Sequence, residues 1–163
     1  MSPQPSAQPV SFPKALLVGG LVVGVLDILD ALIFFSLRGA QPVRILQSIA
    51  SGLLGREAYQ GGVGTAALGT FLHFFIAFAI VATYLAASRR LPVLAEKPFV
   101  FGPLYGLVVY AVMNYGVLPL SAFPGSSRAT QWAVLLNGLL IHALGVGLPS
   151  ALAARAAHRS RRG

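Results

Sequence analysis

Four long hydrophobic runs, separated by short polar stretches, make up most of the chain. They cover approximately residues 15–37, 63–87, 99–122 and 132–154. A helix that crosses a bilayer needs about 20 mostly apolar residues, and each run reaches that length. Membrane β-barrels consist of segments of about ten residues with alternating polarity, unlike these continuous runs. The pattern therefore predicts an all-α, polytopic membrane protein with a bundle of four transmembrane helices.

The segment between the first two runs, residues 42–58, predicts a short amphipathic helix. Pro42 suits the first helical position, and Ile45, Ile49 and Leu53 recur at helical spacing. Such a helix either caps the bundle from the outer side, as an interfacial or re-entrant element, or rests on the lipid headgroups as a linker. The linker is favoured, because no polar residue recurs on the apolar stripe.

The two ends of the chain differ from the predicted transmembrane domain, residues 15–154. Residues 1–14 are rich in Pro, Ser and Gln, which predicts a disordered tail. The run behind Lys14 is longer than the hydrophobic part of a signal peptide, about 7–15 residues, so we expect it to be retained as the first span. Residues 155–163 form a basic tail that is expected to lie in the cytoplasm.

The composition agrees with a lipid environment. Hydrophobic residues make up 56% of the 163 residues and charged residues only 10%, whereas soluble domains carry about 25% charged residues. The mean hydropathy is +0.76. The chain has no cysteine, which excludes disulfide bonds and thiolate metal sites.

The cations, which give a formal net charge of +8, all lie outside the hydrophobic runs. With four spans, both termini and the connection 88–98 share one side of the membrane. This side carries Lys14, Arg89, Arg90, Lys97, Arg155, Arg159, Arg161 and Arg162. The opposite side carries Arg38, Arg44, Arg56 and Arg128. The positive-inside rule therefore predicts a multi-pass protein of the bacterial cytoplasmic (inner) membrane with both termini in the cytoplasm.

The same distribution bears on partners. Cations that flank membrane spans contact anionic lipid headgroups, and we expect this of Arg89, Arg90 and the arginines from residue 155 onward. It does not match the basic face of a nucleic-acid-binding protein, so no nucleic-acid partner is predicted. The lipid bilayer is the expected partner, with a homo-oligomer or another membrane protein left open.

Glycines spaced four residues apart occur in two of the spans. Gly20 and Gly24 lie in the first, and Gly102 and Gly106 in the third. Small residues at this spacing let helix backbones approach closely in lipid. Packing within the chain is the favoured interpretation, and packing between copies is the alternative.

Ionisable and amide side chains inside the spans are the candidate functional residues. They are Asp27, Asp30, His73, His142, Asn114 and Asn137. Polar groups at membrane depth are costly and usually face the interior of a bundle. Counted from the span centres, these residues can reach a similar depth on all four helices. One intramembrane polar cluster is therefore expected.

Asp27 and Asp30 share a face of the first helix. Each costs about 2.5–3.5 kcal/mol near a span centre, while the Leu, Ile, Val and Phe residues of that span return about 4.5–9 kcal/mol. Insertion of this helix alone is thus nearly balanced, and packing against the other spans has to contribute. Because no Lys or Arg lies in a span, we expect Asp27 or Asp30 to hydrogen-bond to a histidine or to ordered water.

Three functions fit these residues. The favoured one is structural: interhelical hydrogen bonds, about 0.6 kcal/mol each on average, fix the bundle of a non-enzymatic assembly or accessory component. The second is a proton relay, or a small proton-coupled transporter or permeation unit. The third is a Zn²⁺ or Fe²⁺ site or a membrane enzyme, but neither histidine belongs to a metal-spaced motif. No catalytic residue and no cofactor is predicted.

Aromatic residues and prolines lie near the ends of the spans. Tyr84, Tyr105 and Trp132 occupy positions where aromatic belts form at membrane interfaces. Pro119 and Pro149 are expected to kink or terminate the third and fourth spans.

Three stretches carry a resemblance to known proteins: GGLVVGVLDILDALIFF, RILQSIASGLLGREAYQGG and GPLYGLVVYAVMNYGVLPLS. Together they resemble a group of small, uncharacterised four-span bacterial inner-membrane proteins. The resemblance covers nearly the whole chain after the N-terminal tail. It implies a four-helix protein of the inner membrane, and it carries over neither an activity nor functional residues.

Overall fold

The structure is a computed structural model that describes residues 10–125 and 131–159, and it confirms the all-α prediction. It contains four helical segments long and apolar enough to cross a membrane. The first two are α1 (Phe12–Ser36) and α3 (Gly62–Arg90). The third consists of α5 (Pro98–Val112), η2 (Met113–Val117) and α6 (Leu118–Leu120). The fourth consists of α7 (Trp132–Ile141), η3 (His142–Gly147) and α8 (Leu148–Arg159).

The ends of the spans differ by a few residues from the predicted ones. α1 begins at Phe12, inside the predicted tail, and α8 continues to Arg159, so that the first part of the basic tail is helical. Pro13 lies in the first turn of α1, where a missing N–H removes no helical hydrogen bond. Arg128, Arg161 and Arg162 lie outside the described residues.

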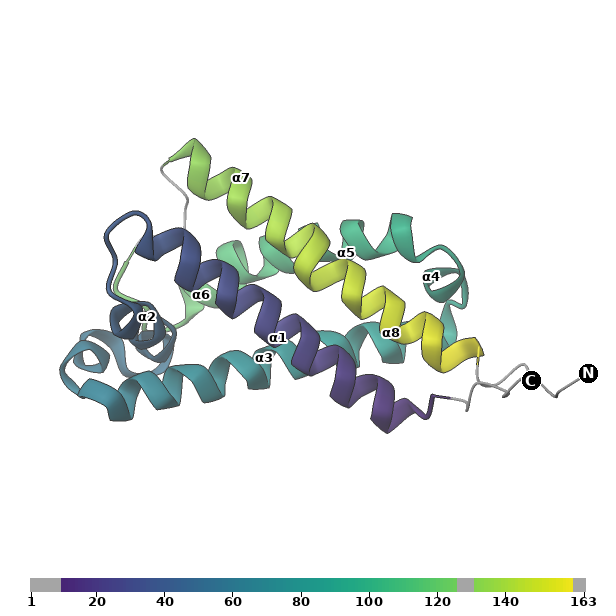
Figure 1. The fold of residues 1–163 in the computed structure, drawn as a ribbon, viewed down its shortest axis with the longest axis horizontal. Helices are drawn as coiled ribbons and strands as arrows, with labels where there is room; N and C mark the ends of the chain where they lie inside the picture. The colour runs from purple at the N-terminus through teal and green to yellow at the C-terminus, as the bar shows by residue number, and fades with distance from the viewer. Residues whose placement is uncertain (1–9, 126–130, 160–163) are drawn as a thin grey trace, which may run out of the picture.

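The spans run along the longest axis of the molecule (Figure 1). α2 (Pro42–Leu54) and η1 (Gly55–Gln60) lie at one end, and α4 (Val93–Glu96) lies at the other, near the start of α1 and the end of α8 (Figure 1). α1 packs against α3 and against the fourth span, and the fourth span also packs against α3 and α5. The fourth span is thus the shared neighbour of the other three.

The glycine pair of α1 provides space for aromatic rings of α3. A Cβ atom at Gly20 would overlap the ring of Phe78, and one at Gly24 would overlap the ring of Phe74. The two rings are four residues apart on one face of α3, so the pair of glycines and the pair of rings interlock. This contact lies within the chain.

The glycine pair of α5 brings two backbones together. A Cβ atom at Gly106 would overlap the carbonyl of His142, and one at Gly102 would press on Leu148 and on the carbonyl of Gly147. Because the obstructing atoms belong to backbone, they cannot move aside as a flexible side chain would. Gly102 and Gly106 therefore set the distance between the third and fourth spans.

Each of these two spans contains a π-helical turn immediately before a proline. In both, the N–H of the preceding residue donates to the carbonyl five residues back: Leu118 to Met113, and Leu148 to Ala143. Pro119 and Pro149 have no N–H to continue the ordinary pattern, so the change of hydrogen-bond register falls at these positions. The helix continues past Pro149 to Arg159, so this proline marks a wide turn and does not end the span.

Two tyrosines join α3 to its neighbours from the inside. Tyr84 is 1% exposed, and its hydroxyl donates to the carbonyl of Leu94 at 2.9 Å. The hydroxyl of Tyr105 donates to the carbonyl of Ile80 at 2.8 Å, which connects α5 to α3. The prediction that Tyr84 belongs to an aromatic belt is therefore wrong, because its ring fills the core. Trp132, 79% exposed, remains on the surface as a belt requires.

α2 is docked on α3. The backbone of Leu46 lies directly against Gly69, where a Cβ atom would overlap its carbonyl. Gln47, 2% exposed, donates its amide to the carbonyl of Gly62 at 3.0 Å. The buried face of α2 thus includes a polar residue, whereas Leu53 of the predicted apolar stripe is 62% exposed. The helix closes one end of the bundle.

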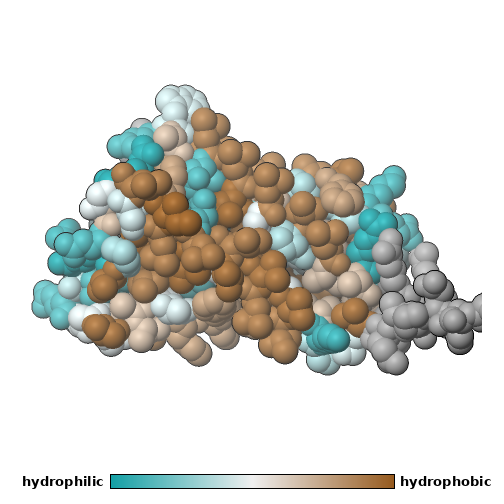
Figure 2. Space-filling view, viewed as in Figure 1, coloured by the Kyte–Doolittle hydropathy of each residue, from teal (hydrophilic) through white to brown (hydrophobic). Residues whose placement is uncertain are grey.

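The outward surface of the spans is apolar. Only 22% of the most apolar stretch of each span is buried inside the protein. Along α1 the exposed residues form a stripe of Leu17, Leu21, Val25, Leu29 and Ile33. Figure 2 shows hydrophobic residues over most of the middle of this face, with hydrophilic residues gathered toward the two ends. These outward surfaces are suited to contact lipid.

Candidate functional site

Asp27 of α1 and His73 of α3 form the centre of the candidate site. Asp27 Oδ2 lies 3.9 Å from His73 Nδ1, and the side chains are 28% and 11% exposed, respectively. His73 Nε2 lies 2.8 Å from the carbonyl oxygen of Gly24. Because a carbonyl oxygen only accepts, Nε2 carries the hydrogen and donates it. In a neutral ring Nδ1 is then the acceptor that faces the carboxyl group.

This tautomer determines how the pair can hold a proton. With one proton between them, Asp27 is a neutral acid beside neutral His73, or Asp27 is a carboxylate beside an imidazolium. The ion pair places opposite charges at 3.9 Å and the neutral pair avoids charge in a low-dielectric medium. At 3.9 Å the two atoms do not share a hydrogen bond, so a proton passes between them only after a closer approach, which leaves Nε2 bonded to Gly24.

Asp30 has a different partner. Asn137 of α7 donates its side-chain amide to Asp30 Oδ2 at 2.7 Å. This contact joins the first span to the fourth, and both residues are partly buried. The expected hydrogen bond between one of the two aspartates and a histidine is not formed within the described residues: Asp27 reaches His73 only at the ion-pair distance of 3.9 Å. Asp30 instead accepts from a neutral amide, which satisfies a carboxylate without adding charge.

His142 and Asn114 bond to their own helices. His142 Nδ1 donates to the carbonyl of Gly138 at 2.9 Å, and the Asn114 amide donates to the carbonyl of Tyr110 at 2.9 Å. The ring of Tyr110 meets the His142 ring edge to face at 5.3 Å. The expected single cluster of six residues is therefore divided into interhelical pairs and local contacts.

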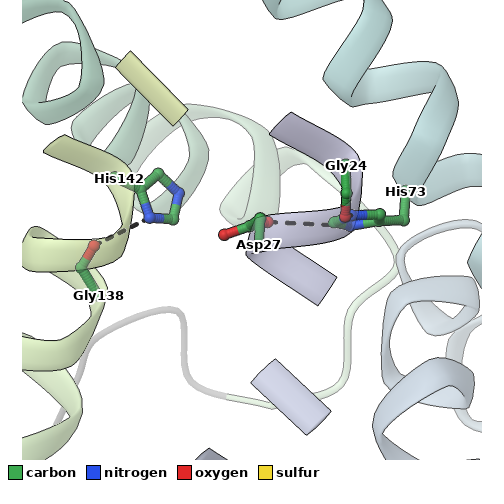
Figure 3. A network of polar contacts seen from close by, with 5 residues as sticks. All are labelled: Gly24, Asp27, His73, Gly138 and His142. Carbon is green, nitrogen blue, oxygen red and sulfur yellow. Dashed lines mark hydrogen bonds and ion pairs between the residues drawn. The ribbon is translucent and has the colours of Figure 1, made fainter. Parts of the chain in front are cut away.

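His142 has a second ring nitrogen, Nε2, that is not bonded to Gly138. Since Nδ1 carries the hydrogen, Nε2 of the neutral ring is an acceptor. In Figure 3, Asp27 lies between the two imidazoles, with one carboxyl oxygen on the side of His73 and the other on the side of His142. In this view the second and fourth spans place one imidazole on either side of Asp27 of the first span.

A metal centre is not assembled in the part of the chain that the structure describes. There, no three His, Cys, Asp or Glu side chains gather closely enough to hold an ion. His73 Nε2 and His142 Nδ1 both donate to carbonyl oxygens, so neither nitrogen is free to be a ligand.

The cations expected at the headgroups lie at the ends of the spans. Arg89 and Arg90 end α3, and Arg155 lies in the last turns of α8. The guanidinium of Arg89 stacks over the ring of Phe12, with 3.9 Å from Cζ to the ring centroid. Arg159 ends α8, and Arg161 and Arg162 lie outside the described residues.

Sequence reasoning missed the carbonyl of Gly24 as a partner of His73. Every residue carries a carbonyl, so its role leaves no mark in the sequence pattern. The available signal was the glycine itself, because a residue without a side chain leaves its backbone open to a ring from the next helix. Gly24 thus both packs against Phe74 and accepts from His73.

No protein-family model matches the chain, and no curated protein and no solved structure matches it.

Proposed function

We propose that this chain is a non-enzymatic, multi-pass component of a bacterial cytoplasmic membrane, with both termini in the cytoplasm. The charge distribution supports this orientation. The end with the start of α1 and with α4 carries Lys14, Arg89, Arg90, Lys97 and Arg155 among the described residues. The opposite end carries Arg38, Arg44 and Arg56. The positive-inside rule requires an excess of Lys and Arg on the cytoplasmic side of the membrane.

The role that the geometry supports best is structural, in the assembly or support of a membrane complex. The Asp30–Asn137 hydrogen bond at 2.7 Å carries this proposal. The Asp30 carboxyl group costs about 2.5–3.5 kcal/mol to insert into the bilayer. Here it is bonded to Asn137 of the fourth span. Polar groups used in this way fix which helices meet and leave the apolar faces available to lipid or to another membrane protein.

The experiment compares abundance with function in variants of the polar residues. Asp30→Ala and Asn137→Ala are expected to lower the amount of folded protein in the membrane and its thermal stability. Asn114→Ala is the matched control, because its amide bonds only within its own helix. If Asn137→Ala and Asn114→Ala lower the melting temperature equally, the interhelical bond has no special structural role.

A second candidate function, proton transfer, is favoured by one observation. Asp27 has no hydrogen bond within the described residues, and its nearest charged partner is His73 at 3.9 Å. A carboxyl group kept at membrane depth without such a bond adds little to stability. Its position between two imidazoles (Figure 3) instead suits a group that accepts and releases protons.

Proteoliposomes with an internal pH-sensitive dye test this second function. Proton transfer through Asp27 predicts flux that Asp27→Asn abolishes at unchanged protein content, while Asp30→Asn keeps it. Equal flux in wild type, Asp27→Asn and empty vesicles would exclude proton transfer and leave the structural role standing.

A further inference from the structure

A small pocket opens where α1 begins and α8 ends. Its volume is about 90 Å³, and the start of α1, the last turns of α3 and the last turns of α8 surround it. The lining residues include polar Ser11, Ser88, Arg89 and His158 and apolar Phe12 and Leu85. Among the residues that the structure describes, no Asp or Glu lines it. The pocket therefore combines positive and hydrogen-bonding groups with apolar walls, at the end of the bundle that carries most of the cations.

Arg89 is held in place and still has free donors. Its guanidinium lies over the Phe12 ring at 3.9 Å from the centroid, which fixes one flat face. Within the described residues its N–H groups make no hydrogen bond, so the edge of the guanidinium remains available. A guanidinium edge matches two oxygens of a phosphate group at once.

His158 is oriented by a buried hydroxyl. Ser88 is 0% exposed, and its Oγ donates to the carbonyl of Leu85 at 2.9 Å. His158 Nε2 lies 3.1 Å from the same Oγ. Because the single hydroxyl hydrogen is directed to Leu85, Oγ accepts from Nε2–H. The imidazole is thereby fixed at the wall of the pocket through two helices.

The beginning of α1 adds to the positive field. Ser11 occupies the cap position, and within the described residues its hydroxyl makes no capping hydrogen bond. The N-terminal end of this helix carries a partial positive charge from the aligned peptide dipoles. Arg89, His158 and this helix end thus converge from three segments on one small volume.

We propose that this pocket binds the phosphate of an anionic phospholipid. The shared chemistry is a phosphate group with at least two free oxygens, held by the guanidinium of Arg89 and the hydroxyl of Ser11. The lipid is the favoured source, because the pocket lies at the end of the apolar spans and its apolar walls can contact the glycerol and the first methylenes of the acyl chains.

The test is a titration of the full-length protein in a neutral detergent, with lipid binding followed by native mass spectrometry. Phosphatidylglycerol is the probe and phosphatidylcholine the reference. We expect one tightly retained phosphatidylglycerol per chain, and Arg89→Gln to weaken it about tenfold. Arg90→Gln is the matched control: Arg90 is the neighbouring exposed cation but does not line the pocket, and its loss should weaken binding less than twofold.

Two further variants keep the proposal testable if Arg89→Gln unfolds. Phe12→Leu keeps every charge and removes the ring beneath the guanidinium, and should weaken phosphatidylglycerol about two- to fivefold. His158→Gln removes no donor that faces the pocket, because Nε2–H is bound to Ser88, and should weaken it less than twofold. Thermal unfolding in the same detergent establishes which variants are folded. Equal losses for Arg89→Gln and Arg90→Gln would show general surface attraction and overturn the proposal.

A second arm distinguishes the sources of the phosphate. Inorganic phosphate at millimolar concentration is added to the protein with bound phosphatidylglycerol. A lipid site predicts that the lipid stays bound, because its glycerol and chains add contacts that free phosphate lacks. Displacement of the lipid by phosphate at this concentration would identify a site for a soluble phosphate compound and contradict the lipid assignment.

Discussion

At the scale of single residues, the hydrogen bond between Asn137 and Asp30 is the contact whose loss should lower stability most directly. Asn137→Ala leaves the Asp30 carboxyl group without its 2.7 Å partner, and an unpaired buried group costs about 1–3 kcal/mol. We expect the double variant Asp30→Ala/Asn137→Ala to lose less than the sum of the single losses. The coupling should be about 0.6–1.7 kcal/mol, the range for interhelical hydrogen bonds in a bundle.

The measurement is a double-mutant cycle on the free energy of unfolding in mixed micelles. Asn114→Ala combined with Asp30→Ala gives the control cycle, because Asn114 bonds only to Tyr110 of its own helix. Additive losses in the Asp30–Asn137 cycle would contradict the interhelical bond.

The residues of the candidate site were predictable as a set, but their pairing was not. Hydropathy alone marks Asp27, Asp30 and the two histidines as exceptions inside the spans. The pairing depends on how each helix is rotated about its axis, which the sequence does not state. His142 illustrates the limit, since its Nδ1 is taken by Gly138 one turn earlier in the same helix, a local alternative available to any histidine.

At the scale of helices, the contact between the third and fourth spans depends on Gly106. Gly106→Ala places a methyl group into the backbone of His142, which cannot yield without separating the two spans. We expect a loss of about 2 kcal/mol or more in stability, comparable to overpacking of a core. The measurement is the melting temperature and the folded yield in detergent.

Gly116 offers a matched control in the same span, because a Cβ atom there meets nothing within 4 Å. Gly116→Ala should change stability by less than about 0.5 kcal/mol. Similar losses for the two variants would mean that glycine flexibility, and not close approach, matters in this span.

The docking of α2 depends in the same way on Gly69. Gly69→Ala would push the methyl group against the carbonyl of Leu46 and is expected to loosen α2 while the four spans stay folded. Hydrogen exchange of residues 42–54 should then rise, with little change in α1 or α5. Gly64→Ala on the same helix, which meets nothing within 4 Å, is the control. Unchanged protection of residues 42–54 in Gly69→Ala would contradict the docking.

Element boundaries were largely predictable because the run lengths follow the thickness of a bilayer. The π turns were not, although Pro119 and Pro149 marked their positions. A proline has no backbone N–H to donate, and a kink, a helix end or a wide π turn can each accommodate the missing hydrogen bond. In the fourth span packing favours the wide turn, because η3 lies against the glycines of α5.

At the scale of the whole molecule, the proposed orientation can be measured directly because the chain has no cysteine. Leu37 and Leu91 are 85% and 56% exposed and lie just beyond opposite ends of the first two spans. Leu37→Cys should react with an impermeant maleimide in intact spheroplasts. Leu91→Cys should react only in inverted vesicles. The reverse pattern would place both termini outside.

The hydrogen bond from Asn137 to Asp30 also has a consequence for synthesis, because it joins residues 107 positions apart. At about 5–20 residues per second, the ribosome makes Asn137 some 5–20 s after Asp30. During this interval the first span has its apolar residues but not its last partner. A chain interrupted before the fourth span exposes an unpaired carboxyl group within the bilayer. Completion of the last helix is therefore the step at which this carboxyl group gains its partner.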